Sequence, residues 1–372
     1  MGVNSERLVN EFLRLVQIDS ESGNERAICD YLIDLFTGLG CIVEEDDSAA
    51  ETGLGSGNLY ILLPATDPAR EPVLLSSHMD TVQPGIGVKP RIDADGYIRT
   101  DGTTILGSDD KAGIAAIIEA VRLAKENGLR HGPVELLISA GEEVGLLGMK
   151  AFNRPLLSRC GFVLDASGPV GKVNVSESGK AKLIVEVTGK AAHSTMPEQG
   201  VNAIVALMRG LSAFTFGRLD SITVANVGVI EGGTADNVVP ETARAILEVR
   251  SLSREKLEQA IAHLCETVEP IVRAEGAAVT FTRIPSCDTY RIEEDAPVLR
   301  LVRRAIAKIG RQTVLADNMG CSDANHLNAR GVPSLKLAIG YENIHSVREQ
   351  MPIAELEKAA ELAYALMEGE MA

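Results

Sequence analysis

The sequence is poor in features that membrane proteins and nucleic-acid-binding proteins use. It has no apolar stretch of about 18 residues, which is the length that a membrane-spanning helix needs. It has no tryptophan, and its 36 basic residues are outnumbered by 52 acidic ones, for a formal net charge of −16. Such a charge repels nucleic-acid phosphates and anionic membrane surfaces. We therefore expect neither a nucleic-acid partner nor a membrane partner.

Cysteine motifs are also missing. The six cysteines form no C-x-x-C pair and no closely spaced group; they stand at positions 29, 41, 160, 265, 287 and 321. This spacing argues against a thiolate zinc site and against a dense disulfide framework. The opening segment, MGVNSERLVNEFLRLV, carries charges within its apolar pattern and predicts a helix rather than a signal peptide. We expect reduced thiols in a cytoplasmic protein.

The length and the element pattern predict two domains. At 372 residues the chain exceeds the roughly 250 to 300 residues at which a single core stops growing. Helices alternate with apolar strands in residues 1–178 and 291–372, which predicts an α/β domain with a mostly parallel sheet and helices on both faces. Residues 179–290 follow the order strand, helix, strand, strand, helix, strand. That βαββαβ order predicts an inserted, ferredoxin-like α+β domain.

Polar side chains gather at the predicted strand ends of the α/β domain. Five groups fall at or just beyond such ends: His78 with Asp80, Asp109, Glu142 with Glu143, Asp165, and His345. Because strand ends of an α/β sheet converge on one crevice, these side chains can meet although they are distant in sequence. A ligand set of histidines and carboxylates without cysteine suits zinc, manganese or cobalt rather than calcium. Carboxylates can also bridge two metal ions, so the set suits a site with two ions.

Charge balance supports two metal ions. Three carboxylates, Asp109, Glu143 and Asp165, with neutral histidines and one hydroxide would balance two divalent cations. Glu142 is then left over, and a carboxylate beside a metal-bound water is what a general base needs.

Asp80 has a separate predicted task. It lies two residues along an extended chain from His78 and points the same way, so it can accept the far imidazole N–H. The alternative is a turn cap before Thr81.

His326 is the alternative to His345, but we expect it on a short helix, DANHLNARG. We expect structural roles for His131 and His263.

Five ordered segments resemble those of the M20 family of dinuclear zinc peptidases and deacylases. They are HMDTV, GSDDKAG, SAGEEVGLLG, LDASGPVG and GYENIHS. Their sequences are most similar to those of the peptidase T branch. The resemblance covers nearly the whole chain. It implies a zinc-peptidase catalytic domain with a lid, Asp109 as the bridge between the metals, and Glu142 as the base. It further implies a cis peptide bond between Asp109 and Asp110, and the following ligands: His78, Asp109, Glu143, Asp165 and His345.

For three residues of the inserted domain, the sequence alone indicates ordinary structural roles. His193 would be an exposed loop histidine, Asn237 a residue of a glycine-rich turn, and Arg250 a surface arginine paired with a glutamate. The resemblance implies more: the histidine and the asparagine polarise the scissile carbonyl, and the arginine fork holds a substrate carboxylate. The resemblance also implies that the GCSDAN loop, with Ser322 and Asp323, lines the substrate pocket, although Cys321 stands where many relatives have glycine.

These residues predict metal-assisted hydrolysis of peptide bonds in short peptides. Glu142 would be the general base on a metal-bridging water, and the preferred reading is a peptidase T-like tripeptide aminopeptidase. A dipeptidase, a carboxypeptidase or an N-acyl-amino-acid deacylase would share every metal residue. A binding protein without activity would have lost the base or a ligand, and none is missing. The resemblance also implies a homodimer through the lid, with His193 acting in cis or in trans. Because the reacting groups lie on two domains, we expect a hinge near Gly179 and Tyr290 to close the lid on substrate.

Overall fold

The computed structural model describes residues 2–369, and they form two compact units. Unit 1 contains the residues up to Ser176, then Arg291–Asp317, and the residues from Ser322 on. Unit 2 contains Glu177–Tyr290 and the short segment Asn318–Cys321.

The short segment Asn318–Cys321 corrects the expected division of the chain, which placed it in the catalytic domain. The reason lies in its bonds. The backbone N–H of Ser178 donates to the carbonyl oxygens of Asn318 at 3.1 Å and Gly320 at 3.2 Å. Cys321 is joined by a disulfide to Cys287, 34 residues away in sequence. The fold thus brings together two cysteines that no local spacing relates.

A nine-stranded sheet forms the centre of unit 1. Its order is β1-β2-β6-β3-β7-β18-β8-β16, and β17 pairs with β8. The strands are β1 Ile42–Glu45, β2 Leu59–Leu63, β3 Val73–His78, β6 Val134–Ser139, β7 Gly161–Ala166, β8 Lys172–Glu177, β16 Tyr290–Arg291, β17 Val314–Asn318 and β18 Ser334–Ala338. The four central strands β6, β3, β7 and β18 run parallel, and β1, β2 and β8 pair antiparallel. Every residue of β3, β6 and β7 is buried, as expected for parallel strands covered on both faces.

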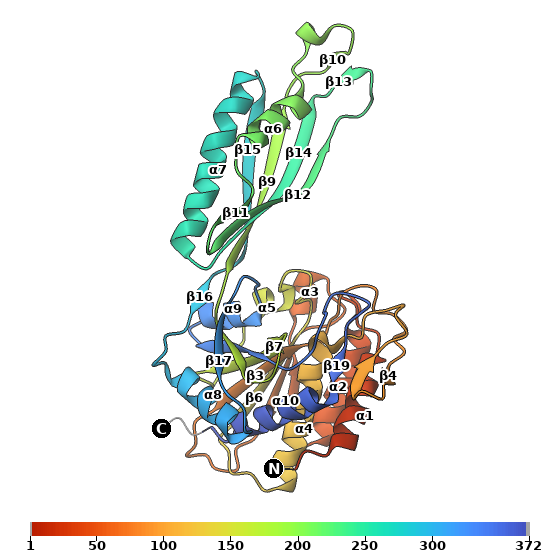
Figure 1. Cartoon of the computed structure of the whole chain (residues 1–372), viewed down its shortest axis with the longest axis vertical. Coiled ribbons are helices and arrows are strands. Elements are labelled where there is room, and N and C mark those ends of the chain that lie inside the picture. Colours follow the sequence, from red (N-terminus) through yellow and green to blue (C-terminus); the bar gives the residue numbers. More distant parts are fainter. Residues whose placement is uncertain (1, 370–372) are drawn as a thin grey trace. The chain divides into compact units, whose positions relative to one another are not determined.

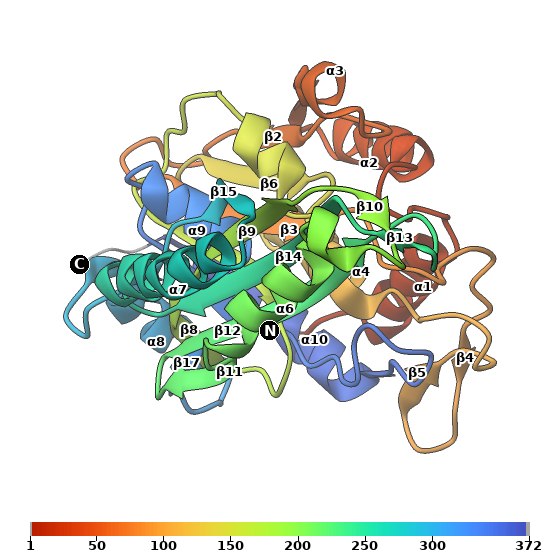
Figure 2. The same ribbon diagram turned by 90° about the horizontal axis from the view of Figure 1, so that it is seen from above.

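Helices cover the two faces of this sheet. Their bounds are α1 Ser5–Val16, α2 Arg26–Gly38, α3 Ser48–Thr52, α4 Ser108–Glu126, α5 Leu147–Ala151, α8 Pro297–Lys308, α9 Asp323–Ala329 and α10 Ile353–Met367. Helix α4 packs on β3 and β7 and contacts α1 and α10, while α5 and α9 lie on the other face (Figures 1 and 2). A small sheet of β4 Arg91–Ile92, β5 Tyr97–Arg99 and β19 Met351–Pro352 lies beside α10. The fold is thus the α/β arrangement that the sequence predicts.

Unit 2 is built on a separate antiparallel sheet in the order β11-β12-β14-β9-β15. Its elements are β9 Gly179–Thr188, β10 Ala192–His193, a 3-10 turn Pro197–Gln199, α6 Ala203–Ser212, β11 Gly217–Asp220, β12 Thr223–Gly232, β13 Val238–Val239, β14 Thr242–Ser251, α7 Arg254–Ala274 and β15 Ala278–Cys287. Burial alternates along β9 and β14, so one face of the sheet packs on α6 and α7. The four long strands and two helices have the split βαβ arrangement.

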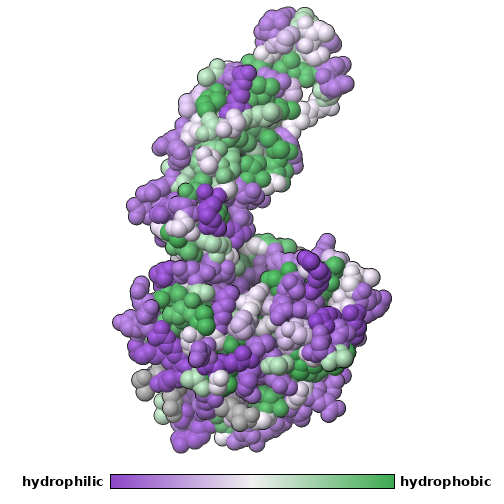
Figure 3. All heavy atoms as spheres, in the orientation of Figure 1, coloured by the Kyte–Doolittle hydropathy of each residue, from purple (hydrophilic) through white to green (hydrophobic). Residues whose placement is uncertain are grey.

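The surface agrees with the composition. Hydrophilic side chains cover most of the visible face of unit 1 (Figure 3). Among residues 2–369, no helix combines the length and the apolar character that a membrane crossing requires.

Candidate metal centre

Neighbouring parallel strands deliver the polar side chains to one place in unit 1. His78 is the last residue of β3, and Asp165 lies near the end of β7. Glu142 and Glu143 follow β6, and His345 lies in the loop after β18. Since β6, β3, β7 and β18 are adjacent and parallel, their carboxyl ends bring these residues together.

Asp109 occupies the middle of the cluster. One carboxylate oxygen, Oδ1, lies 3.2 Å from Nε2 of His78, and the other, Oδ2, lies 3.2 Å from Nε2 of His345. The residue is 7% exposed and stands at the start of α4. A carboxylate that turns its two oxygens to two different imidazoles has the orientation that a bridge between two ions requires.

The remaining ligand atoms fall on the two sides of Asp109. Nε2 of His78 lies 3.8 Å from Oδ1 of Asp165, and Nε2 of His345 lies 2.9 Å from Oε1 of Glu143. Two sets of donor atoms, each within 4.8 Å of one another, share Asp109: one is His78, Asp109 and Asp165, and the other is Asp109, Glu143 and His345.

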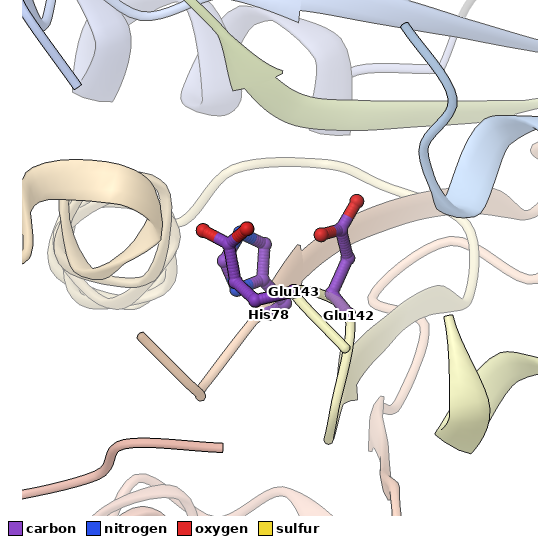
Figure 4. A group of neighbouring side chains, drawn as sticks. All are labelled: His78, Glu142 and Glu143. Atoms are coloured by element: carbon purple, nitrogen blue, oxygen red, sulfur yellow. The ribbon is translucent and has the colours of Figure 1, made fainter. Parts of the chain in front are cut away.

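A third set of donor atoms contains Glu142. It consists of His78, Glu142 and Glu143; in Figure 4 the side chains of His78 and Glu143 overlap, and Glu142 is drawn next to them. Glu142 is half-buried, and its carboxylate accepts no hydrogen bond from the described residues. Burial raises the pKa of the Glu142 carboxyl well above its usual range, and the charge of Asp165 adds to this effect. A carboxyl with a raised pKa is suited to exchanging protons near neutral pH.

The electrostatics of the cluster fit a bound cation. Burial raises the pKa of Asp165, although Lys336 acts against it, and burial also raises the pKa of Glu143. The carboxylates Asp109 and Glu143 raise the pKa of His345 to about 10. The buried carboxylates therefore need positive charge nearby to be stable in their ionised form. Divalent cations would supply that charge. Imidazole and carboxylate donors without thiolate are a zinc-compatible set.

Asp80 lies beside the imidazole of His78 and also contacts the segment that carries Glu142. Nδ1 of His78 lies 3.0 Å from the backbone oxygen of Asp80 and 3.5 Å from its carboxylate Oδ1. The Asp80 carboxylate also accepts the backbone N–H of Glu142 at 2.9 Å and of Glu143 at 3.2 Å. It further accepts the hydroxyl of Ser22 at 2.6 Å. Its role in fixing the orientation of His78 stays a prediction.

Two residues that contact Asp165 were not predicted from the sequence. Nζ of Lys336 lies 3.0 Å from Asp165 Oδ2, and the hydroxyl of Tyr341 donates to Asp165 Oδ1 at 2.9 Å. Lys336 is the single charge within the apolar strand SLKLA, which is a signal that sequence reading could have used. Tyr341 carries no such signal, because a tyrosine after a strand is common in cores.

The backbone near the cluster has unusual conformations. The peptide bond between Asp109 and Asp110 is cis, which confirms that prediction. His345 has a φ of 58°, in the left-handed region that residues other than glycine rarely adopt. Such a conformation persists only where the surroundings hold it, and it occurs often at functional sites.

Three residues considered in the sequence, Ser322, Asp323 and His326, lie at or within helix α9 and make structural contacts there. Ser322 is fully buried and caps α9, accepting the N–H of Ala324 at 3.3 Å. Asp323 is buried and accepts the hydroxyl of Ser139, while His326 lies on the helix and in none of the three donor sets. The contact of Ser322 and Asp323 with substrate stays a prediction.

The predicted residues of unit 2 lie outside these donor sets. His193 is exposed, with Nδ1 at 2.8 Å from the hydroxyl of Thr195. Asn237 is exposed, and its backbone oxygen accepts the N–H of Ser194 at 3.0 Å. The guanidinium of Arg250 donates to Glu248 Oε1 at 2.6 Å, which is the ordinary pairing that the sequence allows. Their catalytic roles stay predictions.

Comparison with known proteins shows the family of the chain. Residues 74–369 match the model of the family described as peptidase family M20/M25/M40. The chain is 42% identical to the protein YqjE of Bacillus subtilis over 98% of this chain and 99% of that protein. It is similar in structure to the aminopeptidase PepT of Bacillus cereus, with a TM-score of 0.91, 43% identity and 99% of each chain covered. A tripeptidase of Staphylococcus aureus has a TM-score of 0.94 at 37% identity, with 98% of each chain covered. The chain belongs to the peptidase family M20/M25/M40 and is a metal-dependent peptidase.

Proposed function

We propose that this chain is a tripeptide aminopeptidase that holds two divalent metal ions in unit 1. The two-sided placement of Asp109, with one oxygen at His78 and the other at His345, carries the metal part of the proposal. The names of the B. cereus aminopeptidase and the S. aureus tripeptidase, at 43% and 37% identity, support the substrate class.

Each ion is assigned three protein ligands. Asp109 would contribute to both ions, His78 and Asp165 would hold the first, and Glu143 and His345 would hold the second. Zinc suits these nitrogen and oxygen donors, with manganese or cobalt as substitutes. When bound, the ions polarise the scissile carbonyl and lower the pKa of water. The exposed edge of His345, which is 49% accessible, leaves the cluster open to substrate.

Glu142 moves the protons of the reaction. Its carboxylate accepts a proton from the attacking water and returns that proton to the nitrogen of the leaving amine. Asp80 orients it, because the Asp80 carboxylate holds the backbone N–H of Glu142 at 2.9 Å.

Unit 2 is assigned to substrate binding. His193 and Asn237 are the donors for the developing oxyanion, and Arg250 is the partner of the carboxylate of the peptide. Arg250 would exchange Glu248, its partner at 2.6 Å, for the substrate carboxylate. The proposed homodimer forms through this unit, where Met208, Val229 and Ile230 are 56%, 40% and 54% exposed. Hydrophobic side chains also show around β12 and β14 in Figure 3.

One assay tests the proposed substrate class. Purified protein with zinc is given Ala-Ala-Ala and N-acetyl-Ala-Ala-Ala, and the released products are separated. We expect cleavage of the free tripeptide after its first residue and no cleavage of the blocked one, because an aminopeptidase requires the α-amine. Release of acetate would indicate a deacylase, and release of the C-terminal alanine a carboxypeptidase.

The Glu142→Gln protein is the control for this assay. We expect it to keep its metal, measured by elemental analysis, and to lose about 10²- to 10⁴-fold in kcat, which is the usual contribution of a general base. Full activity of Glu142→Gln would remove the mechanism.

A further inference from the structure

We infer that Glu349 is a positioning residue that holds Asp109 in place for metal binding, an inference that rests on the proposed metal site. Glu349 is 2% exposed, and its carboxylate accepts four hydrogen bonds from the segment that leads into Asp109. Oε2 accepts the backbone N–H of Leu106 at 2.9 Å and of Gly107 at 2.8 Å. Oε1 accepts the hydroxyl of Ser108 at 2.6 Å and the backbone N–H of Asp109 at 3.0 Å.

The same glutamate belongs to the loop that carries His345. That loop is closed at its base by Glu342 and Gln350, whose backbone N–H groups donate to each other's carbonyls at 3.0 Å and 3.1 Å. Within it, the N–H of Glu349 donates to the carbonyl of Ser346 at 3.0 Å. Glu349 therefore joins the two loops that bring Nε2 of His345 to 3.2 Å from Asp109.

Only a carboxylate can make this set of contacts. All four partners are donors, and a carboxylate accepts through both of its oxygens, whereas an amide accepts through one. A glutamine at position 349 would direct its NH2 group toward two donors and leave at least one backbone N–H of the segment 106–109 without an acceptor. The segment 106–109 would then shift relative to His345. The Asp109 carboxylate would no longer direct one oxygen to His78 and the other to His345.

Glu135 supplies a matched comparison. It is also a fully buried glutamate that serves as an acceptor for backbone N–H groups. Its carboxylate accepts from the N–H of Leu157 at 2.9 Å, the N–H of Ser158 at 2.7 Å and the hydroxyl of Tyr60 at 2.8 Å. It lies near the start of β6, whereas Glu142 and Glu143 follow the end of that strand. A substitution of Glu135 therefore reports the effect of losing a buried carboxylate away from the metal centre.

The experiment compares wild type, Glu349→Gln and Glu135→Gln as full-length proteins stripped of metal. The zinc dissociation constant is measured by competition with a chelating dye, the Co²⁺ form by its visible absorption spectrum, and stability by the thermal midpoint. We expect both variants to unfold at lower temperature. Only Glu349→Gln should bind zinc about 10- to 100-fold more weakly, the usual effect of removing a residue that orients a ligand, and show an altered Co²⁺ spectrum.

Different results would overturn the role of Glu349 and the proposed function. If Glu349→Gln binds zinc as wild type does, within about twofold, Glu349 only stabilises the fold and the inference is overturned. If that variant does not fold, Glu349→Asp decides, because it keeps both oxygens at a shorter reach; we expect at least about threefold weaker zinc binding, and wild-type affinity would overturn the inference. Absence of zinc binding by the wild-type protein would instead overturn the proposed function, and with it the role of Asp109.

Discussion

Asp80 shows how a carboxylate serves the site through the backbone of its neighbours. Sequence position related it to His78, because residues two apart on an extended chain point the same way. In the structure one oxygen lies 3.5 Å from Nδ1 of His78, and the two oxygens also accept the N–H groups of Glu142 and Glu143, at 2.9 Å and 3.2 Å. Those donors lie more than 60 residues away and are backbone groups, so no side-chain motif could indicate them.

Replacing Asp80 tests this orienting contact. In Asp80→Asn one carboxylate oxygen becomes an NH2 group, and one of the two N–H groups loses its acceptor. We expect kcat on a tripeptide to fall about 10- to 100-fold, because Glu142 is then less well placed. Zinc affinity should change less, since the nearest partner of His78 Nδ1 is the backbone oxygen at position 80, at 3.0 Å.

The control for this variant is Ser22→Ala, which removes only the hydroxyl that donates to Asp80 at 2.6 Å. A smaller loss in kcat is expected there. The assignment would fail if Asp80→Asn lost zinc and kept the kcat of whatever protein remained loaded.

At the scale of elements, helix α4 and strand β7 must approach closely to set the distance between Asp109 and Asp165. Gly113 makes this approach possible. A Cβ at this position would collide with the carbonyl oxygen of Leu164 and lie 2.8 Å from both carboxylate oxygens of Asp110. The helix therefore carries glycine where alanine would otherwise be preferred by about 1 kcal/mol.

We expect Gly113→Ala to lower the free energy of unfolding by about 1 to 3 kcal/mol, because overpacking outweighs the gain in helix propensity. Activity should fall as well, since α4 carries Asp109. Urea unfolding of the metal-free protein measures the first effect and a peptidase assay the second.

Gly38→Ala is the matched control. Gly38 is the last residue of α2, has no positive φ, and would place a Cβ with nothing within 4 Å. Its unfolding free energy should stay equal or rise by up to about 1 kcal/mol. If both variants were equally stable, the close approach at Gly113 would not matter.

At the scale of the whole molecule, the chain divides its predicted functions between two units. The three donor sets lie in unit 1, and His193, Asn237 and Arg250 lie in unit 2. Each unit has its own hydrophobic core. Mixed variants can reveal whether residues of the two units that act together come from one copy of the chain or from two.

We expect Glu142→Ala and His193→Ala to be inactive alone and to regain activity when unfolded and refolded together. In a mixed dimer with His193 acting in trans, one of the two sites has an intact Glu142 and an intact His193. Half of the dimers are mixed, so about a quarter of wild-type activity should return. A mixture that stays inactive, although gel filtration shows dimers, would place His193 in cis.

Much of the fold could be predicted from the sequence because the signals are local. The alternation of helices with apolar strands indicated the parallel sheet, and the βαββαβ order indicated the second unit. The edges were harder, since the antiparallel pairing of β1, β2 and β8 leaves no distinct local pattern. The segment Asn318–Cys321 was misassigned because its unit depends on bonds to Ser178 and Cys287.

The sequence by itself determined which residue types reach the strand ends, and so determined that a site of histidines and carboxylates forms there. Its ordered motifs also pointed to the family. Only the tertiary structure decided which oxygen faces which imidazole, that Lys336 and Tyr341 contact Asp165, and that Glu349 accepts four hydrogen bonds before Asp109. The physical reason is that side-chain periodicity is encoded locally, whereas hydrogen-bond partners depend on how distant loops pack.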